Sequence, residues 1–335
     1  MKALAVAAAV ASIHAPAGVH VSTVARGIPY ATNIAFDPAG GMWVTSSPGG
    51  PADTDGVWYI RKGSHKPRHI VRDIHIVLGL RWVGGSLYVA NALNASTGRV
   101  SEYSGFTGTR FTHARTAIPR LKIGRHTVDS IVAGPDGRIY LGVGSVYDNR
   151  GTPGRVVSFR EGGAGLRLEA TGLRNPYGLA FVPGTNRLLV TDNGRDDLGL
   201  NRPPEELDSF DITAGIPNFG FPNCYDQGGS ACAGKVAPIA TFAPHASSDG
   251  LAITRHWGKR GMTAFVAENG SSYSNHTGSD VRIVSIGGGG TSASEALFAS
   301  GFASHDPLGA AIGPDGALYV TLFMSGKVVR FSQPR

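Results

Sequence analysis

Residues 130–143, with the sequence SIVAGPDGRIYLGV, decide the fold of this chain. Two apolar runs flank a Pro-Asp-Gly segment, and this segment is typical of a tight turn between two β-strands. Residues 309–321, GAAIGPDGALYVT, repeat the pattern almost residue for residue. A pattern that recurs in this way predicts a repeated supersecondary unit, so the number of copies sets the architecture.

Further copies, two of them weaker, occur at residues 33–45, 79–90, 178–191 and 250–267. Several hairpins are followed by a run that alternates apolar and polar residues, such as 155–159 and 327–331, and this alternation predicts another strand. Each unit is then a small antiparallel sheet that cannot bury both of its faces alone. Because radial packing of six such sheets buries those faces, we predict an all-β fold, a six-bladed β-propeller with antiparallel four-stranded blades. The alternative, a β-sandwich, rarely shows six matched hairpins.

The composition agrees with many short strands and excludes several other classes. Glycine accounts for 48 of the 335 residues, and each interior glycine disfavours a helix by roughly 1 kcal/mol. The hydrophobic fraction of 41% suffices for a sizeable core, and no linker marks a second domain, so we predict one propeller domain over residues 22–335. The net charge of +7 permits an anionic partner. The densest basic stretch, residues 61–72, lacks aromatic residues for base stacking, so we expect no nucleic-acid partner.

An apolar run at residues 3–13 follows Lys2, and Ala15-Pro16-Ala17 then supplies a small-residue cleavage pattern. These features predict a secretory signal peptide over residues 1–17, too short to span a membrane. The alternative is an alanine-rich tail. No later stretch reaches 18 apolar residues, so we expect no membrane span and a secreted or periplasmic protein.

The chain contains two cysteines, Cys224 and Cys232, on either side of a loop-like segment. In an exported protein they would form a disulfide that staples this loop. Two free thiols would instead fit a cytosolic protein.

Polar residues just before the first strand of a propeller hairpin point toward the mouth of the central channel. His126 lies at such a position before residues 130–143, and a histidine there can act as a general base near neutral pH. Asp129 either orients the imidazole or caps a turn. Arg174 and Asn175 precede another hairpin, where they can bind a carboxylate and a polar ligand atom. The alternative role for Arg174 is to hold backbone carbonyls of a blade.

A third polar segment, DNGRDDLG at residues 192–199, is followed by PPEELD at residues 203–208. Oxygen-rich loops that contain glycine suit Ca²⁺, through side chains or backbone carbonyls. The spacing is not that of an EF-hand loop, and a solvated acidic turn is the alternative.

Taken together, these segments resemble the soluble glucose/sorbosone dehydrogenase family, especially its sorbosone-dehydrogenase-like branch. The resemblance covers most of the chain after residue 25 and is most specific in three stretches: RNPYGLAFVPGTNRLLVTDNGRDDLG at 174–199, PPEELDSF at 203–210 and GIPNFGFPNCYD at 215–226. Members of this family are six-bladed propellers, and the characterised ones are quinoproteins that use pyrroloquinoline quinone (PQQ) with Ca²⁺. The resemblance therefore implies a sugar or aldose dehydrogenase with an external electron acceptor.

The resemblance also implies a role for each candidate residue. The position of His126 is that of the family's catalytic base, which takes a proton from the sugar hydroxyl while hydride passes to the quinone. Arg174 and Asn175 match the Arg-Asn pair on the cofactor, and the backbone carbonyls of Gly194 and Arg195 match Ca²⁺ ligands. The side chain of Arg195 is a further candidate for binding the quinone.

The sequence departs from the family on the fifth and sixth blades, where characterised members hold the tricarboxylate quinone with further basic residues. Residues 267–276 and 304–308 contain neither lysine nor arginine. Two other functions therefore stay open. One is a Ca²⁺-dependent hydrolase of the lactonase type, to which Asn33, Asp192 and Asn269 would contribute ligands. The other is a non-enzymatic propeller that binds a glycan or a protein through its loops.

Overall fold

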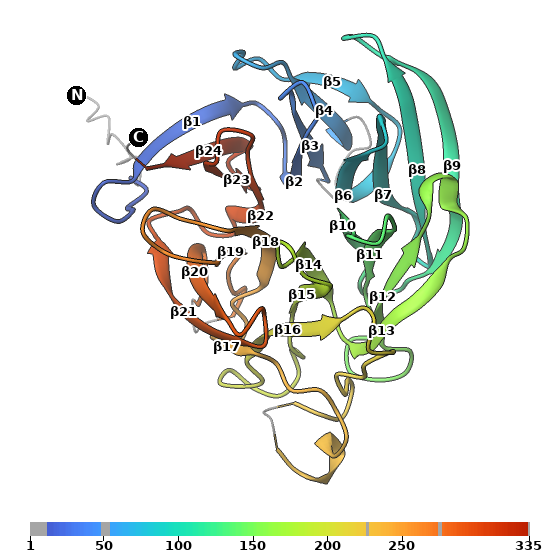
Figure 1. The fold of residues 1–335 in the computed structure, drawn as a ribbon, viewed down its shortest axis with the longest axis vertical. Helices are drawn as coiled ribbons and strands as arrows, with labels where there is room; N and C mark the ends of the chain where they lie inside the picture. Colours follow the sequence, from blue (N-terminus) through green and yellow to red (C-terminus); the bar gives the residue numbers. More distant parts are fainter. Residues whose placement is uncertain (1–11, 48–53, 226–227, 274–276, 334–335) are drawn as a thin grey trace, which may run out of the picture.

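The computed structural model describes residues 12–47, 54–225, 228–273 and 277–333, and these residues form six four-stranded sheets arranged radially (Figure 1). Every pairing between neighbouring strands is antiparallel. The predicted six-bladed β-propeller is confirmed. Among the described residues, no helix is long and apolar enough to cross a membrane.

Blades one to three follow the chain in order, each with four consecutive strands. They comprise β2 (Ala31–Phe36), β3 (Met42–Ser46), β4 (Gly56–Ile60) and β5 (Arg68–Val71); β6 (His75–Val83), β7 (Ser86–Asn94), β8 (Thr97–Phe106) and β9 (Phe111–Lys122); and β10 (Val128–Ala133), β11 (Ile139–Val143), β12 (Gly154–Phe159) and β13 (Arg167–Leu173). A short 3-10 helix, η2 (Glu161–Gly163), joins β12 to β13.

Blades four and five continue this order, and the sixth is completed from the other end of the chain. They comprise β14 (Pro176–Phe181), β15 (Arg187–Asp192), β16 (Glu205–Asp211) and β17 (Ala240–Phe242); β18 (Ser248–Thr254), β19 (Thr263–Glu268), β20 (Asp280–Gly287) and β21 (Ser292–Ala299); and β22 (Pro307–Ile312), β23 (Leu318–Leu322), β24 (Lys327–Ser332) and β1 (His20–Arg26). The 3-10 helix η3 (Ser230–Cys232) lies between β16 and β17.

The ring is closed by strand pairing between the two ends of the described chain. β1 pairs with β24 from His20 opposite Ser332 to Arg26 opposite Lys327, and the two strands lie side by side in Figure 1. Six hydrophobic clusters fill the interfaces between adjacent blades, including the interface between blades six and one. The core is therefore a ring of blade interfaces rather than one central cluster.

The Pro-Asp-Gly turns behave as the sequence predicts. Gly137 and Gly316 have φ angles of 73° and 75°, a left-handed conformation that glycine adopts without a steric penalty. The aspartate before each glycine accepts a hydrogen bond from a tyrosine of the following strand, at 3.0 Å for Tyr140 and 3.1 Å for Tyr319. Turn and strand thus form one local unit, which explains why the whole segment recurs in the sequence.

Buried threonine hydroxyls tie neighbouring blades together around the central channel. Thr191 donates to the carbonyl of Asp249 at 2.6 Å, Thr321 donates to that of Thr32 at 2.9 Å, and Thr32 donates to that of Val77 at 2.7 Å. Each of these bonds crosses from one blade to the next. The innermost strand of each blade is called its inner strand; these are β2, β6, β10, β14, β18 and β22. Held together in this way, the inner strands form a stiff wall that can position side chains at both mouths of the channel.

The two cysteines form a disulfide, Cys224–Cys232, as predicted for an exported chain. It lies in the long segment between β16 and β17, which extends beyond the rim of the propeller (Figure 1).

The predicted signal peptide lies mainly outside the described residues, which begin at Ser12, and it stays a prediction. Its last residues contact the propeller. The backbone of His14 exchanges two hydrogen bonds with that of Ser300, at 2.8 and 3.0 Å, and Ile13 and Ala15 pack against the cluster between blades five and six.

Because of these contacts, a chain that starts at Gly18 is expected to be less stable than one that starts at Ser12. Two backbone hydrogen bonds and two partly buried side chains are worth roughly 2 kcal/mol, which corresponds to a melting temperature lower by about 2–4 °C. Calorimetry of the two chains tests this. Equal melting temperatures would show that residues 12–17 add nothing to the folded state.

Candidate functional site

A cavity of about 300 Å³ opens at the mouth of the channel where the inner strands begin. Loops of blades three, four and five surround it. Its walls include four predicted site residues, His126, Arg174, Asn175 and Gly194. The structure therefore brings together most of the residues that the sequence singled out.

His126 lies in the loop before β10, with its side chain 15% exposed. Its Nε2 lies 3.2 Å from Oδ1 of Asp148. Burial, assisted by Arg174, lowers the pKa of His126, although the hydrogen bond to Asp148 acts in the opposite direction. The imidazole is therefore neutral near pH 7, and with the proton of Nε2 donated to Asp148, Nδ1 is the atom that can accept another proton.

A glycine makes room for this histidine. A Cβ atom added to Gly144 would lie 2.2 Å from the Cβ of His126, far closer than two carbon atoms can approach. Any side chain at residue 144 would therefore displace His126 from its place beside Asp148.

Arg174 is almost fully buried and is engaged by protein groups. Its Nη2 donates to Asp148 at 2.5 Å and to Asp196 at 2.6 Å, and its Nη1 donates to the carbonyl of Asn193 at 3.2 Å. The hydrogen bond from His126, together with the charge of Arg174, holds the pKa of Asp148 well below its usual value. Asp148 is thus an ionised group that links His126 to Arg174. Because the charge of Arg174 is already paired with Asp148 and Asp196, this side chain positions its neighbours rather than binding an anionic ligand.

Two other groups in the cavity remain available to a ligand. The side-chain amide of Asn175 has no hydrogen bond among the described residues, and Asn175 lines the cavity. Arg125, next to His126 in sequence, also lines it, is exposed, and has no ion-pair partner in the described part of the chain. Arg125 is therefore the cation of this site that is free to meet an anion.

The side chain of Arg195 points elsewhere. Its guanidinium binds Asp197 at 2.8 Å and the carbonyl of Pro222 at 2.9 Å, and it lies 5.6 Å from the centre of the Tyr225 ring. It lines a neighbouring small cavity that shares Arg174, Asn193 and Gly194 with the cavity around His126. The structure does not bring this side chain to His126.

Asp129 is also separate from His126, and Asp148 occupies the orienting position instead. Asp129 lies on β10, is 1% exposed, and its Oδ2 has no hydrogen-bond partner among the described residues. Burial, with the nearby charges of Asp249 and Asp192, raises the pKa of Asp129 well above its usual value. Asp129 therefore belongs to a buried polar group inside the channel.

Oxygen atoms that can bind a cation lie at two places beside the cavity. The carbonyls of Gly194 and Arg195 accept no hydrogen bond from the described residues, and the amide of Gly194 is fixed by Glu205 at 2.7 Å. Burial raises the pKa of Glu205 to about 8. The carbonyls predicted from the resemblance are thus free to coordinate an ion.

The second place is a cluster of carboxylates on one face of blade four. Asp192 pairs directly with Glu206 across β15 and β16, and Asp208 follows two positions later. One oxygen from each of these three residues lies within 4.8 Å of the others, and both oxygens of Asp208 lack a hydrogen-bond partner among the described residues. Such oxygen sets suit Ca²⁺.

The three residues considered for a lactonase-type site do not converge. Asn33 lines a cavity at the opposite mouth and donates to Ser130 at 2.9 Å. The amide of Asn269 donates to the carbonyls of His305 and Pro307, at 3.0 and 3.2 Å. Asp192 accepts hydrogen bonds from the backbone amides of Arg174 and Asn175, between blades three and four. These residues do not surround one metal position.

Sequence reasoning missed several residues of this cavity and its support, among them Arg125, Asp148, Asp196, Glu205, His245 and Tyr273. Asp196 and Glu205 lay in stretches already recognised as oxygen-rich, and Arg125 adjoins His126. Asp148 and His245 carried no such signal.

No family model matches the sequence. A stretch of 60 residues, 18% of this chain, is 40% identical to an uncharacterized protein of Borreliella burgdorferi and spans 15% of that protein. Solved structures match over nearly the whole chain. An iodide structure of a Trichoderma reesei carbohydrate-active enzyme of family AA12 has 16% identity and a TM-score of 0.79, with 100% of both chains covered.

Two other similar structures are of proteins that bind PQQ. The holo form of the PQQ domain of pyranose dehydrogenase from Coprinopsis cinerea has 18% identity and a TM-score of 0.75, over 96% of this chain and 97% of that one. PQQ-bound aldose sugar dehydrogenase from Streptomyces coelicolor has 18% identity and a TM-score of 0.72, over 95% and 99%. At these identities the likeness establishes the fold, as the resemblance predicted.

Proposed function

We propose that the protein is a sugar dehydrogenase that oxidises an aldose with PQQ and Ca²⁺, with His126 as the general base. The observation that carries the proposal is a neutral histidine held by an ionised aspartate in a cavity of about 300 Å³ at the channel mouth. The occurrence of the same fold in PQQ-bound sugar dehydrogenases supports it.

The residues present fit both cofactors. Free carbonyls at Gly194 and Arg195 provide the hard oxygen ligands that Ca²⁺ prefers. A tricarboxylate needs positive charge, which the ion and Arg125, without an ion-pair partner among the described residues, would supply, and Asn175 offers an amide to a polar atom of the quinone. The quinone, when bound, supplies the acceptor for the hydride of the sugar.

The protein's own part in the reaction is a proton transfer. His126 accepts the proton of the sugar hydroxyl at Nδ1 while its Nε2–H stays bonded to Asp148. Asp148 remains ionised and stabilises the imidazolium that forms, and Arg174 fixes the position of Asp148. Tyr273 packs against His245 with ring centres 4.6 Å apart and the rings tilted by 44°, and it lies exposed at the rim, where it can pack against one face of a sugar.

We also propose that the protein is exported and passes its electrons to an external acceptor. The disulfide Cys224–Cys232 supports export, because disulfides persist in oxidising compartments. The predicted signal peptide at residues 1–17 agrees with this.

The test is a titration of the purified protein with PQQ in the presence of Ca²⁺, followed by absorbance and calorimetry. We expect saturable one-to-one binding, and loss of the quinone absorbance when an aldose is added. Removing a charge-assisted hydrogen bond costs about 1.5–3 kcal/mol, so Arg125→Ala should weaken PQQ binding by roughly 10- to 100-fold.

Arg110→Ala, which removes an exposed arginine in the turn between β8 and β9 that does not line this cavity, is the matched control, and its affinity for PQQ should be close to that of the wild type. Absence of binding at about 50 μM PQQ, an affinity weaker than roughly −6 kcal/mol, would overturn the proposal. It would favour a propeller that binds a glycan or a protein through its loops.

A further inference from the structure

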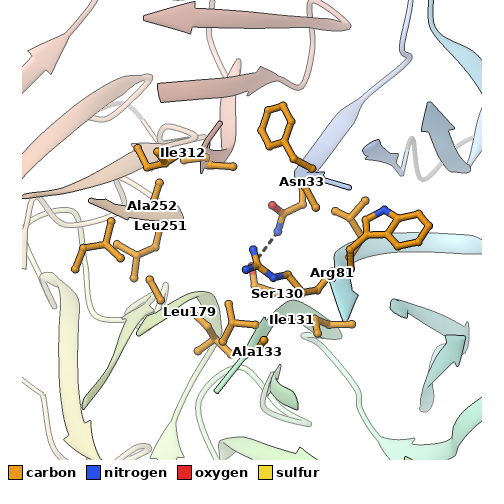
Figure 2. Close-up of a pocket in the computed structure, with 18 of the residues that line it drawn as sticks. Asn33, Arg81, Ser130, Ile131, Ala133, Leu179, Leu251, Ala252 and Ile312 are labelled. Atoms are coloured by element: carbon orange, nitrogen blue, oxygen red, sulfur yellow. Dashed lines mark hydrogen bonds between the residues drawn. The ribbon is translucent and has the colours of Figure 1, made fainter. Parts of the chain in front are cut away.

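The opposite mouth of the channel holds a second and larger cavity of about 560 Å³ (Figure 2). It is lined by the last residues of the six inner strands and shares no lining residue with the cavity around His126. The two cavities are therefore lined by different residues, and a ligand bound at one mouth would not contact the residues that line the other cavity.

The inner strands present one equivalent position to this second mouth. In every blade, the residue at this position pairs with the equivalent residue of the second strand. These partners on the second strands are Trp43, Tyr88, Tyr140, Leu189, Phe265 and Tyr319. The six residues are Ala35, Arg81, Val132, Ala180, Ala252 and Ala311. Five blades thus carry a small apolar residue that leaves the mouth hollow, and blade two alone carries a cation.

The side chain of Arg81 extends from β6 into the middle of the cavity, toward Asn33 and Ser130 (Figure 2). In the described part of the chain, the guanidinium of Arg81 has neither a carboxylate within ion-pair distance nor a hydrogen bond. Water reaches the side chain, yet the surrounding protein lowers the pKa of Arg81 by desolvation. The only other charged lining residue, Asp37, already accepts hydrogen bonds from Trp43 at 2.9 Å and from the amide of Gly41 at 2.8 Å.

A hydroxyl group that lines the same cavity as Arg81 adds a second donor. Asn33 donates from Nδ2 to Oγ of Ser130 at 2.9 Å, and Oδ1 of Asn33 accepts from the amide of Ile34 at 2.8 Å. Ser130 therefore uses its oxygen as an acceptor, and its hydroxyl proton has no acceptor among the described residues. The lining of the cavity thus offers a planar guanidinium and a hydroxyl donor.

We propose that this mouth is a binding site for a small organic carboxylate. The carboxylate would take two parallel hydrogen bonds from Arg81, the geometry that a guanidinium favours, and a third from Ser130. Apolar side chains such as Ile131, Leu251 and Ile312 line the walls against which the carbon skeleton would pack (Figure 2). The volume lies within the usual range for small-molecule sites.

The charge of the site favours a monoanion. Arg81 is the only cation among the described lining residues, and no metal-binding set of carboxylates occurs among them. Asp37, the one lining carboxylate, lies outside ion-pair distance of Arg81 and has its own hydrogen-bond donors. A phosphate dianion would keep one uncompensated charge in the cavity, whereas a carboxylate is matched one to one. A carboxylate is therefore expected to bind more tightly than inorganic phosphate.

The proposal is tested by calorimetry and thermal-shift titration of the full chain with sodium benzoate, sodium gluconate and inorganic phosphate. We expect saturable binding of at least one carboxylate with a dissociation constant of roughly 10 μM to 1 mM, and a melting temperature that rises with its concentration. Arg81→Ala should weaken this binding at least tenfold, and Ser130→Ala should weaken it by a smaller factor.

Arg81→Ala is expected to fold, because alanine occupies the same position on four other blades. A melting temperature without ligand equal to or above that of the wild type would confirm this. Arg72→Ala, which removes an exposed arginine outside the cavity, is the matched control and should bind the carboxylate normally.

Three results would overturn the proposal. They are the absence of carboxylate binding up to about 10 mM, equal binding by the wild type and Arg81→Ala, and tighter binding of phosphate than of any carboxylate. Since these assays need neither quinone nor sugar, their outcome is separate from that of the proposed dehydrogenase activity.

Discussion

Replacing His126 by alanine is expected to lower kcat for aldose oxidation by about 10²- to 10⁴-fold, the usual contribution of a general base. The imidazole is neutral near pH 7 because burial lowers its pKa, and it is oriented by Asp148 at 3.2 Å. Alanine removes the proton acceptor and leaves Asp148 and Arg174 in place. Quinone-dependent dye reduction by the reconstituted variant measures the loss.

Binding of PQQ, measured separately, should be much less affected in this variant than turnover. His20→Ala, which removes an exposed histidine on β1, is the control and should retain wild-type activity. Equal activity of His126→Ala and the wild type would show that another group accepts the proton.

Asp148→Asn separates an orienting role from general damage to the site. Activity should rise with pH as His126 loses its proton, at a pKa below the ordinary value of 6.5. The hydrogen bond to Asp148 raises this pKa, so its loss should move the acid limb of the pH–kcat/KM profile to lower pH while the plateau also falls. An unmoved acid limb would mean that Asp148 does not act through His126.

The second large effect concerns the pH dependence of stability. Asp249 is buried inside the channel, and this burial raises its pKa to about 7. Hydrogen bonds from Asn193 and Ser247 act in the opposite direction but are outweighed by burial. Between the ordinary pKa of 3.8 and about 7, the folded protein holds a proton that the unfolded chain has released. The contribution of Asp249 to stability must therefore fall as the pH rises through this window and level off above it.

The size of this effect follows from the pKa difference. At 1.36 kcal/mol for each pKa unit, Asp249 accounts for a loss on the order of 4 kcal/mol across the window. Asp249→Asn cannot ionise, and an amide can keep the bonds to Asn193 and Ser247. The free energy of unfolding of the variant, relative to the wild type, should therefore increase from pH 4 to pH 7.

Denaturant unfolding at several pH values, with metal ions chelated, measures this difference. Taking the difference between variant and wild type cancels the contributions of ionisable groups that do not interact with Asp249. The charge of Asp249 also raises the pKa of Asp129, so any change in the titration of Asp129 is part of the measured effect of Asp249. Asp211→Asn is the matched control: hydrogen bonds from Thr213 lower the pKa of Asp211, so its difference curve should be flat from pH 5 to pH 8. A flat curve for Asp249→Asn would contradict the assignment of a raised pKa.

The blades could be predicted from the sequence because each hairpin is specified locally. The Pro-Asp-Gly turn requires a left-handed glycine, and its aspartate binds a tyrosine only four positions later. The closure of the ring by β1 could not be predicted from a local pattern of this kind. The residues that pair with β1 lie on β24, at the other end of the chain.

The candidate site could be predicted only where its residues adjoin a hairpin. His126, Arg174 and Asn175 were found in this way. The partner of His126 was not, because Asp148 is separated from it by 22 positions and reaches it only through the loop after β11. Asp129 seemed the nearer partner in sequence, but it already belongs to β10, and the strand carries its side chain into the closed channel. Proximity in sequence fails here because the chain changes direction between the loop and the strand.

The pairing of β1 with β24 has a consequence for the order in which this protein can fold. The first five blades each consist of neighbouring segments and can form as the chain emerges, whereas the sixth needs strands about 300 residues apart. Bringing such distant segments together costs roughly 5 kcal/mol in chain entropy on a logarithmic loop-closure scale. A nascent chain therefore carries an open, five-bladed arc with two exposed interfaces until its last strand is synthesised. A circular permutant with new ends between two other blades would move this late step to another interface while keeping every contact of the finished ring.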